Sequence, residues 1–465
     1  MTARFMISAA HKSSGKTMLS IGLCAALRQR NLTVQPFKKG PDFIDPMWLS
    51  RASGRACRNL DFYLMGHEEI RETFELHARD ADVALVEGNK GLYDGLHLDG
   101  SNSNAALAKL LDIPVVLVLD TRGTIRGVAP LLLGYQAFDK GIQIAGVILN
   151  QVGGARHESK LRAVITEYTD VPVLGAVYHD PSMSIEERHL GLMPSNESRV
   201  AEAQIEAIGQ AVSTQVDIDL LRAVTHSAIA KAARPPAAGM PVGKYRIGVA
   251  QDRAFGFYYA DDLDALKAGG AELVTIDTLR DPHLPAGLNG LLVGGGFPEM
   301  FMAELEANTS LRIEINQAIE QGLPVYAECG GLMYLARTMQ WKERPYQMVG
   351  AIPGDVHMHD HPVGRGYVRL KETGNGPWPD AVVDDIPAHE FHYSTLDNLP
   401  DDLVYAYEVK RGHGVDGKRD GIVRKNLLAS YTHLRSTRNF SWVKRFLSLV
   451  ALHASTQSHG REQAA

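Results

Sequence analysis

The sequence predicts an α/β protein with two domains, the first built on a doubly wound parallel sheet. Residues 1–200 alternate short apolar segments with amphipathic ones. The apolar segments are rich in Val, Ile and Leu without polar alternation, which is typical of strands buried on both faces of a parallel sheet. Helical patterns separate them, so we expect crossover helices between the strands. The expected strands are residues 4–10, 32–38, 82–88, 113–120, 144–150 and 171–177, and the expected helices include 15–30 and 102–112.

A second α/β domain is expected after a linker. Residues 200–228 have a helical pattern, and the stretch 231–243 combines two adjacent prolines with Ala and Gly, which is typical of a linker. A new strand rhythm begins at 245–252 and continues through 271–278, 290–299 and 323–331, before turns and short strands take over near residue 340. We therefore predict a first domain at 1–195, a helix and linker at 196–243, a second domain at 244–450 and a polar, disordered tail at 451–465.

Composition narrows the class of protein. Apolar residues make up 45% of the chain and charged residues 22%, as in ordinary soluble proteins. The net charge of -6 argues against a nucleic-acid partner, which needs a basic face. Three cysteines cannot form a disulfide framework, and no apolar run reaches the roughly 18 residues of a membrane span. We expect a cytoplasmic protein without a membrane partner.

A phosphate-binding loop is predicted at residues 10–17, Ala-His-Lys-Ser-Ser-Gly-Lys-Thr. This is the end of the G-x-x-x-x-G-K-[ST] pattern, with Ala10 in place of the first glycine, and it lies between an expected strand and an expected helix. Lys16 can reach the β- and γ-phosphates of ATP, and the Thr17 hydroxyl can bind Mg²⁺. Lys12 adds a second lysine inside the loop, the variant found in dethiobiotin synthetases and septum-placing ATPases. A chance match on a surface turn is the alternative. The predicted ATP-binding residues are Lys12, Ser13, Ser14, Gly15, Lys16, Thr17 and Asn150.

Acidic residues follow two further strands, in Lys38–Pro46 and Glu87–Gly95. Loops at the carboxyl ends of parallel strands face the ligand crevice, so Asp42, Asp45, Glu87 and Asp94 are expected near the phosphates. Carboxylates there would hold Mg²⁺, for which we predict Thr17, Asp42 and Glu87. Ordinary turn residues are the alternative. At the end of the expected strand 144–150, the amide of Asn150 can read adenine or simply cap the strand.

A nucleophile is predicted at Cys329. The segment 323–335 is an apolar strand, a Cys-Gly-Gly turn and the start of a helix, which is the geometry that exposes a nucleophile and favours a thiolate. A buried structural cysteine is the alternative. Backbone amides of the glycine turn 294–296 are expected to form an oxyanion hole, to which we assign Gly295, Gly296 and Gly330. His433, after an apolar run, is the expected base, although His389, His392 and His413 compete.

The order of these motifs resembles the cobyrinic acid a,c-diamide synthases. The resemblance spans residues 4–440 and rests on the phosphate loop, KGPDFIDP, EG with GLYDG, RHLGL (188–192), GGGFPE, AECGGLMYL, EFHYS (390–394) and SYTHLRS. It implies a dethiobiotin synthetase-like domain that binds ATP and a tetrapyrrole, fused to a class I-type glutamine amidotransferase domain. The implied reaction is amidation of the a and c acetates through a phosphorylated carboxylate, with ammonia from glutamine delivered internally. ATP, Mg²⁺ and glutamine are the implied cofactors and nitrogen donor, and a homodimer is an open expectation.

Two positions depart from the family's usual pattern. Many relatives have Val-Met where this chain has Asn89-Lys90. A cationic Lys90 can pair with another carboxylate, so sirohaem or sirohydrochlorin is an alternative substrate. Class I amidotransferases often carry a glutamate two residues after the histidine, where this chain has Arg435, so the group that orients His433 is unknown. Residues expected to act on the substrate carboxylate are Lys39, Asp45, Lys90, Tyr93 and Asp94.

Other interpretations stay open. A partitioning-type ATPase would explain the first domain but not the Cys-Gly-Gly turn, and a dethiobiotin-type carboxylase would not use glutamine. The histidines of residues 357–361 are a weak candidate for a metal patch and are more typical of an exposed loop. The EFHYS segment is a candidate for the domain interface.

Overall fold

The chain forms two compact units, residues 1–235 and 236–465, which are described separately. The structure, a computed structural model, describes residues 2–188, 191–227, 244–342 and 344–464. The predicted linker at 231–243 and part of the RHLGL motif lie outside these residues. Among the described helices none is long and apolar enough to cross a membrane.

The first unit is built on a parallel sheet of strand order β3-β2-β4-β1-β5-β6-β7. Its central strands are buried along almost their whole length, as expected from their continuous apolar sequences. The short β10 (His226–Ser227) pairs antiparallel with β1, and β8 (Glu187–Arg188) pairs with β9 (Gly191–Leu192). The sheet strands are β1 (Thr2–Ala9), β2 (Val34–Lys39), β3 (Arg58–Leu60), β4 (Val83–Glu87), β5 (Val115–Asp120), β6 (Ile144–Val152) and β7 (Val173–Tyr178).

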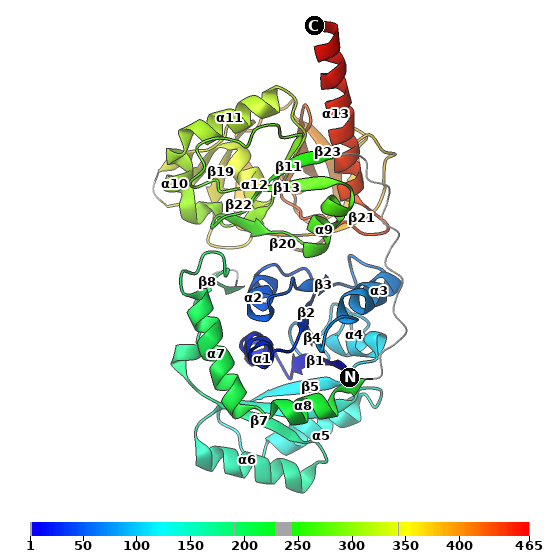
Figure 1. Cartoon of the computed structure of the whole chain (residues 1–465), viewed down its shortest axis with the longest axis vertical. Coiled ribbons are helices and arrows are strands. Elements are labelled where there is room, and N and C mark those ends of the chain that lie inside the picture. Colours follow the sequence, from blue (N-terminus) through cyan, green and yellow to red (C-terminus); the bar gives the residue numbers. More distant parts are fainter. Residues whose placement is uncertain (1, 189–190, 228–243, 343, 465) are drawn as a thin grey trace. The chain divides into compact units, whose positions relative to one another are not determined.

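Helices cover both faces of this sheet, which confirms the predicted doubly wound architecture (Figure 1). Helix α7 packs along α1, where Gly209 fits closely against Ala25. The first unit therefore extends past the boundary predicted at residue 195. The helices are α1 (Lys16–Gln29), α2 (Ile44–Ser53), α3 (His67–Ala78), α4 (Asn104–Leu111), α5 (Val128–Phe138), α6 (Ala155–Tyr168), η1 (Pro181–Met183), α7 (Ala201–Gln215) and α8 (Ile218–Val224).

The second unit contains a mixed sheet of strand order β13-β11-β14-β16-β25-β24-β23-β20-β21. The first five are parallel, namely β13 (Ala271–Ile276), β11 (Tyr245–Ala250), β14 (Gly290–Val293), β16 (Val325–Glu328) and β25 (Leu427–Ser430). The others are antiparallel, namely β24 (Arg419–Arg424), β23 (Val404–Arg411), β20 (Gly364–Glu372) and β21 (Ile386–His392). Along β16, Val325 and Ala327 join the apolar core on one face and Tyr326 joins the core on the other. This alternation decides where the residues at the end of β16 point.

Smaller elements complete the second unit. Its other strands are β12 (Phe255–Phe257), paired with β15 (Gly295–Gly296), and a small sheet of β17 (Ala336–Gln340), β18 (Pro345–Gln347), β19 (Ile352–Met358) and β22 (Ser394–Asp397). Its helices are α9 (Ala260–Ala268), η2 (Pro298–Phe301), α10 (Met302–Ala307), α11 (Thr309–Glu320), α12 (Gly330–Leu335) and α13 (Trp442–Ala464). Helix α13 runs through the segment 451–464, for which the sequence predicted a polar, disordered tail. The stretch is rich in helix-forming Ala, Gln, Glu and Arg, and the apolar first turns of α13 start the helix on the core.

Candidate active sites

The loop between β1 and α1 has the geometry of an anion-binding site. Ser13 and Gly15 have positive φ angles of 62° and 87°, and Gly15 caps α1 without a side-chain hydrogen bond to the first amides. These amides and the positive end of the helix dipole are therefore free to bind phosphate. Lys16 Nζ donates to the loop carbonyl of His11 at 3.3 Å. Burial, followed by the nearby ammonium of Lys38, lowers the pKa of Lys16 to about 8.

Asn150 supports the loop from below. It lies inside β6, which continues to Val152, and is 1% exposed. Its Nδ2 donates to Ser14 O at 2.9 Å, while the Ser14 hydroxyl donates to His11 O at 2.8 Å. A Cβ on Gly15 would lie 2.1 Å from this amide, so only glycine fits at that position. Asn150 thus has a structural contact with the loop, and its reading of adenine stays a prediction.

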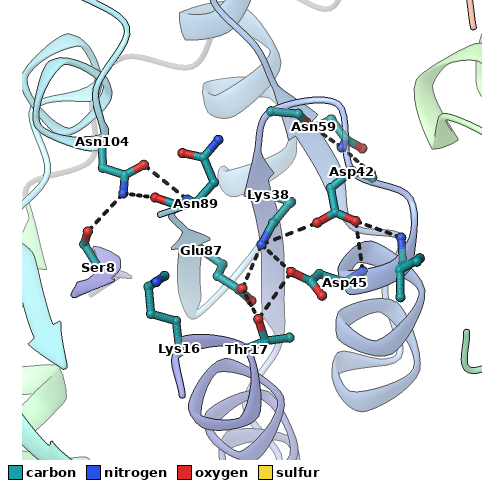
Figure 2. Close-up of polar contacts among 12 residues, drawn as sticks. Ser8, Lys16, Thr17, Lys38, Asp42, Asp45, Asn59, Glu87, Asn89 and Asn104 are labelled. Atoms are coloured by element: carbon teal, nitrogen blue, oxygen red, sulfur yellow. Dashed lines mark hydrogen bonds and ion pairs between the residues drawn. The ribbon is translucent and has the colours of Figure 1, made fainter. Parts of the chain in front are cut away.

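Lys38 lies at the centre of the acidic cluster expected near the phosphates (Figure 2). Its ammonium donates hydrogen bonds to Asp45 and to Glu87 (2.8 Å) and lies 3.7 Å from Asp42. The Thr17 hydroxyl donates to Glu87 at 2.7 Å and to Asp45 at 3.2 Å. The structure therefore brings the predicted metal ligands together and adds Lys38, which sequence reasoning had not assigned to the site.

Charges in this cluster depend strongly on one another. Burial alone would lower the pKa of Lys38, but the carboxylates of Asp45, Glu87 and Asp42 raise it well above its usual value. Burial raises the pKa of Glu87. Burial, together with repulsion from Asp45, raises the pKa of Asp42 to about 7. The ammonium of Lys38 therefore stabilises carboxylates that burial would otherwise protonate.

The cluster also fits a magnesium ion. Oxygen ligands from carboxylates and a hydroxyl suit Mg²⁺. Glu87 is fully buried, and its Oε2 has no hydrogen-bond partner among the described residues. Among the described residues, no group of three or more His, Cys, Asp or Glu side chains has by itself an arrangement that could hold a metal ion. Here the ammonium of Lys38 supplies the positive charge between the carboxylates.

Two buried asparagines shape the loops around the cluster, and sequence analysis did not identify either. The amide of Asn59, on β3, donates to Gly40 O at 2.9 Å and Asp42 O at 2.7 Å. Asn104 starts α4, and its amide donates to Ser8 Oγ at 3.1 Å and Gly91 O at 3.0 Å. Both side chains bind backbone carbonyls of loops that have no regular structure, which is how irregular segments are held in one conformation. Asn59 and Asn104 lie in segments with other polar residues, so neither gives a sequence signal for such a role.

The residues predicted to act on the substrate carboxylate do not all meet. Asp45 lies in the Lys38 cluster, and Lys39 is buried with its Nζ donating to Asn89 Oδ1 at 3.2 Å. Burial chiefly lowers the pKa of Lys39 to about 8. Lys90 is exposed, with a φ angle of 45°.

Tyr93 and Asp94 have local contacts instead. The Tyr93 hydroxyl donates to Tyr135 O at 2.7 Å, and its ring packs against those of Tyr135 and Phe138. Asp94 accepts a hydrogen bond from Gly91 N at 3.0 Å and is otherwise exposed. Both contacts stabilise the turn after β4, which makes these two residues weaker candidates for the chemistry.

A cavity of about 920 Å³ opens over the phosphate loop. Lys12, Lys16 and Thr17 line one end, together with Asp42 and Asp45. On the far side of β1, where β5, β6 and β7 end, the cavity is lined by Arg122, Gln151 and His179. The remaining lining residues are Asp180, Pro181, Met183, Ser184, Ile185 and Leu192, the last of which belongs to β9, a strand that contacts α2. The volume suits a nucleotide.

In the second unit, Cys329 forms a strained turn between β16 and α12. Its φ and ψ angles are 49° and -106°, which a residue with a side chain rarely adopts, and its N–H donates to Ser430 O at 2.7 Å. A Cβ on Gly331 would lie 2.0 Å from Val293 O, so the sharp turn needs glycine there. The backbone therefore has the predicted strand–turn–helix geometry, whereas the Cys329 residue itself is buried and only 6% exposed.

His433 lies beside this thiol, as predicted. Burial alone would lower the pKa of His433, but its hydrogen bonds with Cys329 and Glu328 raise the pKa to about 10. The ring of His389 stacks on it at 4.8 Å between centroids, and the two residues exchange backbone hydrogen bonds. Burial and the charges of His433 and Arg435 lower the pKa of His389 well below its usual value. These opposite pKa shifts favour a protonated His433 beside a neutral His389.

An acid also faces His433, at a position that sequence analysis missed. Glu328 Oε2 lies 3.3 Å from His433 Nδ1. Arg435, at the position where a glutamate was considered, instead pairs with Asp261 at 2.8 Å and lies over the ring of Tyr259. In the sequence, the only hint of this role is that Glu328 directly precedes the predicted nucleophile Cys329.

The predicted oxyanion donors lie against this turn. A Cβ on Gly330 would lie 3.0 Å from Gly296 N, and one on Gly295 would lie 2.6 Å from His433 Cε1. The glycine turn therefore approaches both the turn of Cys329 and the imidazole of His433, and its role as an oxyanion hole stays a prediction. The EFHYS segment borders the same site, since Cys329 Sγ lies 3.9 Å from Phe391 O.

The other histidine candidates are engaged elsewhere. The ring of His392 stacks on Tyr431 at 4.0 Å between centroids, and His413 Nδ1 lies 3.0 Å from Gly414 O. His359, from the candidate metal patch, lies 3.0 Å from Thr395 Oγ1.

Comparisons with known proteins agree with this division. Residues 5–192 match the CobQ/CobB/MinD/ParA nucleotide binding domain, and residues 246–439 match the CobB/CobQ-like glutamine amidotransferase domain. The chain is 46% identical over 441 residues to the cobyrinate a,c-diamide synthase of Magnetococcus marinus, covering 93% of each protein. It is 41% identical to the protein of that name from Methanosarcina acetivorans, covering 93% of this chain and 92% of that protein. The corresponding protein of Archaeoglobus fulgidus is 39% identical, with 96% of both chains covered.

These relatives match nearly the full length, and the chain carries both a nucleotide-binding and a glutamine amidotransferase domain. A partitioning-type ATPase does not account for the second domain. The chain belongs to the cobyrinate a,c-diamide synthase family and is a glutamine-dependent ligase.

Proposed function

We propose that this ligase uses ATP, Mg²⁺ and glutamine to convert the a and c acetate side chains of a cobyrinate-type tetrapyrrole into acetamides. The proposal rests on one observation. A Cys329–His433 pair and a phosphate loop with its carboxylate–lysine cluster occur in the same chain. The first suits release of ammonia from an amide, and the second suits activation of an acid. The names of the full-length relatives support the tetrapyrrole as the acid.

Glutamine hydrolysis would proceed through a thioester on Cys329. The thiolate attacks the amide carbon, and the oxyanion is stabilised by amides of the glycine turn. The imidazolium of His433 then gives its proton to the leaving ammonia, and neutral His433 accepts a proton from the water that hydrolyses the thioester. Ammonia is mostly ammonium in neutral water, so we propose that it passes to the second reaction without release.

Activation of the carboxylate would occur at the phosphate loop. A substrate carboxylate oxygen attacks the γ-phosphorus of ATP, and ADP leaves. Ammonia then attacks the acyl carbon, and phosphate carries away the carboxylate oxygen. Lys12, Lys16 and the loop amides are arranged to bind the negative phosphates, and Lys38 and the Thr17 hydroxyl both donate to Glu87 Oε1. When bound, Mg²⁺ would be held by Thr17, Glu87 and, in place of the predicted Asp42, by Asp45, whose carboxylate accepts a hydrogen bond from the Thr17 hydroxyl. It would neutralise charge on the phosphate oxygens.

The adenine end of ATP would lie over the other end of the 920 Å³ cavity. Gln151 and His179 are joined there by a 2.5 Å hydrogen bond and, with Arg122, offer polar groups for the base. Asn150 is buried beneath the loop, so its contribution would come through Ser14 rather than through the base.

Oxygen transfer tests the activated carboxylate. With a tetrapyrrole labelled with ¹⁸O in its acetate carboxylates, each amide formed should release one phosphate that carries one ¹⁸O. A wild-type enzyme that forms amides but releases unlabelled phosphate would exclude a phosphorylated carboxylate. Amide formation without ADP release would exclude ATP as the activator.

Sirohaem or sirohydrochlorin is a second candidate substrate, because it carries the same acetate and propionate periphery. The exposed ammonium of Lys90 favours it, since together with Lys39 it gives one more cation for a carboxylate at the ends of β2 and β4. Lys90→Met should change the ratio of rates with cobyrinate and sirohaem. An unchanged ratio would remove Lys90 from substrate choice.

A further inference from the structure

The histidine of the amidotransferase site lacks an acid at the position two residues further along. Arg435 occupies that position, and its guanidinium is bound to Asp261 and stacked on Tyr259. His433 nevertheless needs a partner at Nδ1, because a neutral imidazole can accept the thiol proton at Nε2 only when Nδ1 carries a hydrogen.

Glu328 is held in the conformation that supplies this partner. Its side chain lies on the same face of β16 as that of Tyr326, whose hydroxyl donates to Glu328 Oε1. The backbone N–H of Leu434 donates to the same oxygen at 2.8 Å. Two donors therefore fix Oε1, and Oε2 is left 3.3 Å from His433 Nδ1.

The surroundings keep this arrangement rigid. Tyr326 is fully buried and packs on Trp442 at 4.6 Å between ring centroids. Glu328 is 7% exposed, so its interaction with the imidazole is weakly screened. The titratable or charged groups around the ring of His433 are Cys329 and Glu328 at the end of β16, His389 from β21, and Arg435 beyond His433 itself.

We propose that Glu328 is the positioning residue of the glutaminase site and takes the place of the missing acid after His433. Its carboxylate fixes the Nδ1–H tautomer, turns Nε2 toward Cys329 and stabilises the imidazolium. The inference rests on the glutamine-hydrolysing part of the proposed function and requires no particular acid substrate.

Glu328→Gln removes the negative charge of the side chain and keeps its size and shape. The two donors on Oε1 would hold the glutamine oxygen there, so its NH₂ group would face Nδ1. An N–H donor in that place favours the opposite tautomer, with the hydrogen on Nε2, and the imidazole can no longer accept the proton of Cys329. We expect glutaminase kcat/KM to fall by about 10²- to 10⁴-fold, as for other triads forced into the wrong tautomer. The alkaline limb of its pH profile should move to lower pH, because the imidazolium loses its counter-charge.

The experiment uses the full chain and four readouts. Glutamate release is measured against pH, and the rate at which iodoacetamide alkylates Cys329 is measured against pH without glutamine. Amidation driven by ammonium chloride is measured for each variant, and circular dichroism monitors folding. Glu408→Gln is the control, because Glu408 is an exposed residue of the same unit whose carboxylate pairs with the exposed Lys410.

Glu328→Gln should lose glutaminase activity and shift the alkylation profile, while ammonia-driven amidation and the control stay at wild-type levels. Glu328→Asp, which keeps the charge, should recover part of the loss. Activity within about threefold of wild type, or an unshifted alkylation profile, overturns the proposal. If Glu328→Gln does not fold, Tyr326→Phe decides: a shifted alkylation profile supports the role and an unshifted one overturns it. A wild-type enzyme that releases glutamate but amidates no tetrapyrrole would contradict the proposed substrate and leave the result on Glu328 intact.

Discussion

Lys38→Met is the most informative change in the first unit, because it removes the only ammonium seen to contact the buried carboxylates among the described residues. Lys38 is 3% exposed and Glu87 is fully buried. The ammonium contacts Asp45 and Glu87 directly and lies within 4 Å of Asp42. Methionine has a similar length and leaves the packing volume nearly unchanged, so the loss is chiefly electrostatic.

The expected loss of folding stability follows from the buried charges that remain after the substitution. Removing one partner of a buried ion pair destabilises a protein by about 3–5 kcal/mol, because the other charge stays buried without compensation. Three carboxylates, those of Asp42, Asp45 and Glu87, are left without this ammonium, so we expect a loss in that range near neutral pH. Protonation relieves the repulsion, so the loss should shrink as pH falls. Mg²⁺ should stabilise the variant more than the wild type, because the cation then has no competing ammonium.

Hydrogen exchange followed by mass spectrometry reports the first unit separately. Amides of β1 and β4 should exchange about 10²-fold faster or more in the variant, and amides of the second unit should not change. Lys90→Met is the matched control, since Lys90 is exposed and the same substitution there should change stability by less than about 0.5 kcal/mol. A loss below about 1 kcal/mol for Lys38→Met, or equal stabilisation of both proteins by Mg²⁺, would refute the reasoning.

Two further predictions concern the division of labour and pH. Lys16→Ala should abolish amide formation with either nitrogen source but leave glutamate release. Cys329→Ala should abolish glutamate release but keep amidation with ammonium chloride. Loss of both activities in either variant, measured by glutamate and product assays, would contradict two separate sites. Burial holds the pKa of Lys16 at about 8, and the protonated form binds phosphate, so ATP affinity should be full below pH about 8 and weaken as pH rises through it. Calorimetry in buffers of different ionisation enthalpy should then detect proton uptake on ATP binding above that pH, and an affinity that stays constant from about pH 7 to 9 would be the contrary result.

The strands and the two motif turns were predictable because their signals are local. Continuous apolar runs identified the buried parallel strands, whereas β3, only three residues with Arg and Asn, has no such signal. The glycines after Lys12 and Cys329 predicted sharp turns, and both turns contain residues with positive φ angles. The face of a strand to which a given side chain points, and contacts between segments distant in the sequence, were not predictable. Lys38 and Lys39 are adjacent in an extended strand and point to opposite faces, and sequence analysis chose Lys39, although Lys38 contacts the cluster.

Contacts between distant segments explain the remaining misses. Glu328 becomes recognisable only when β16 and β25 pair and bring His433 beside it. Asn150 was interpreted as the end of a strand, but β6 continues and turns its amide under the phosphate loop. An acid was expected at position 435 because that position lies two residues after His433, but this chain has Arg435 there. The acid that faces His433 is Glu328, which comes from another strand, β16.

Transfer of the glutamine amide nitrogen to a tetrapyrrole acid tests the central claim most directly. The full enzyme is incubated with ATP, Mg²⁺ and glutamine labelled with ¹⁵N in its side-chain amide, together with either cobyrinate or sirohaem. The masses of the products are then measured by mass spectrometry. We expect one of the tetrapyrroles to gain two amides, each carrying ¹⁵N, with an ADP released for each. Glutamate release with no labelled amide on either tetrapyrrole would contradict the account.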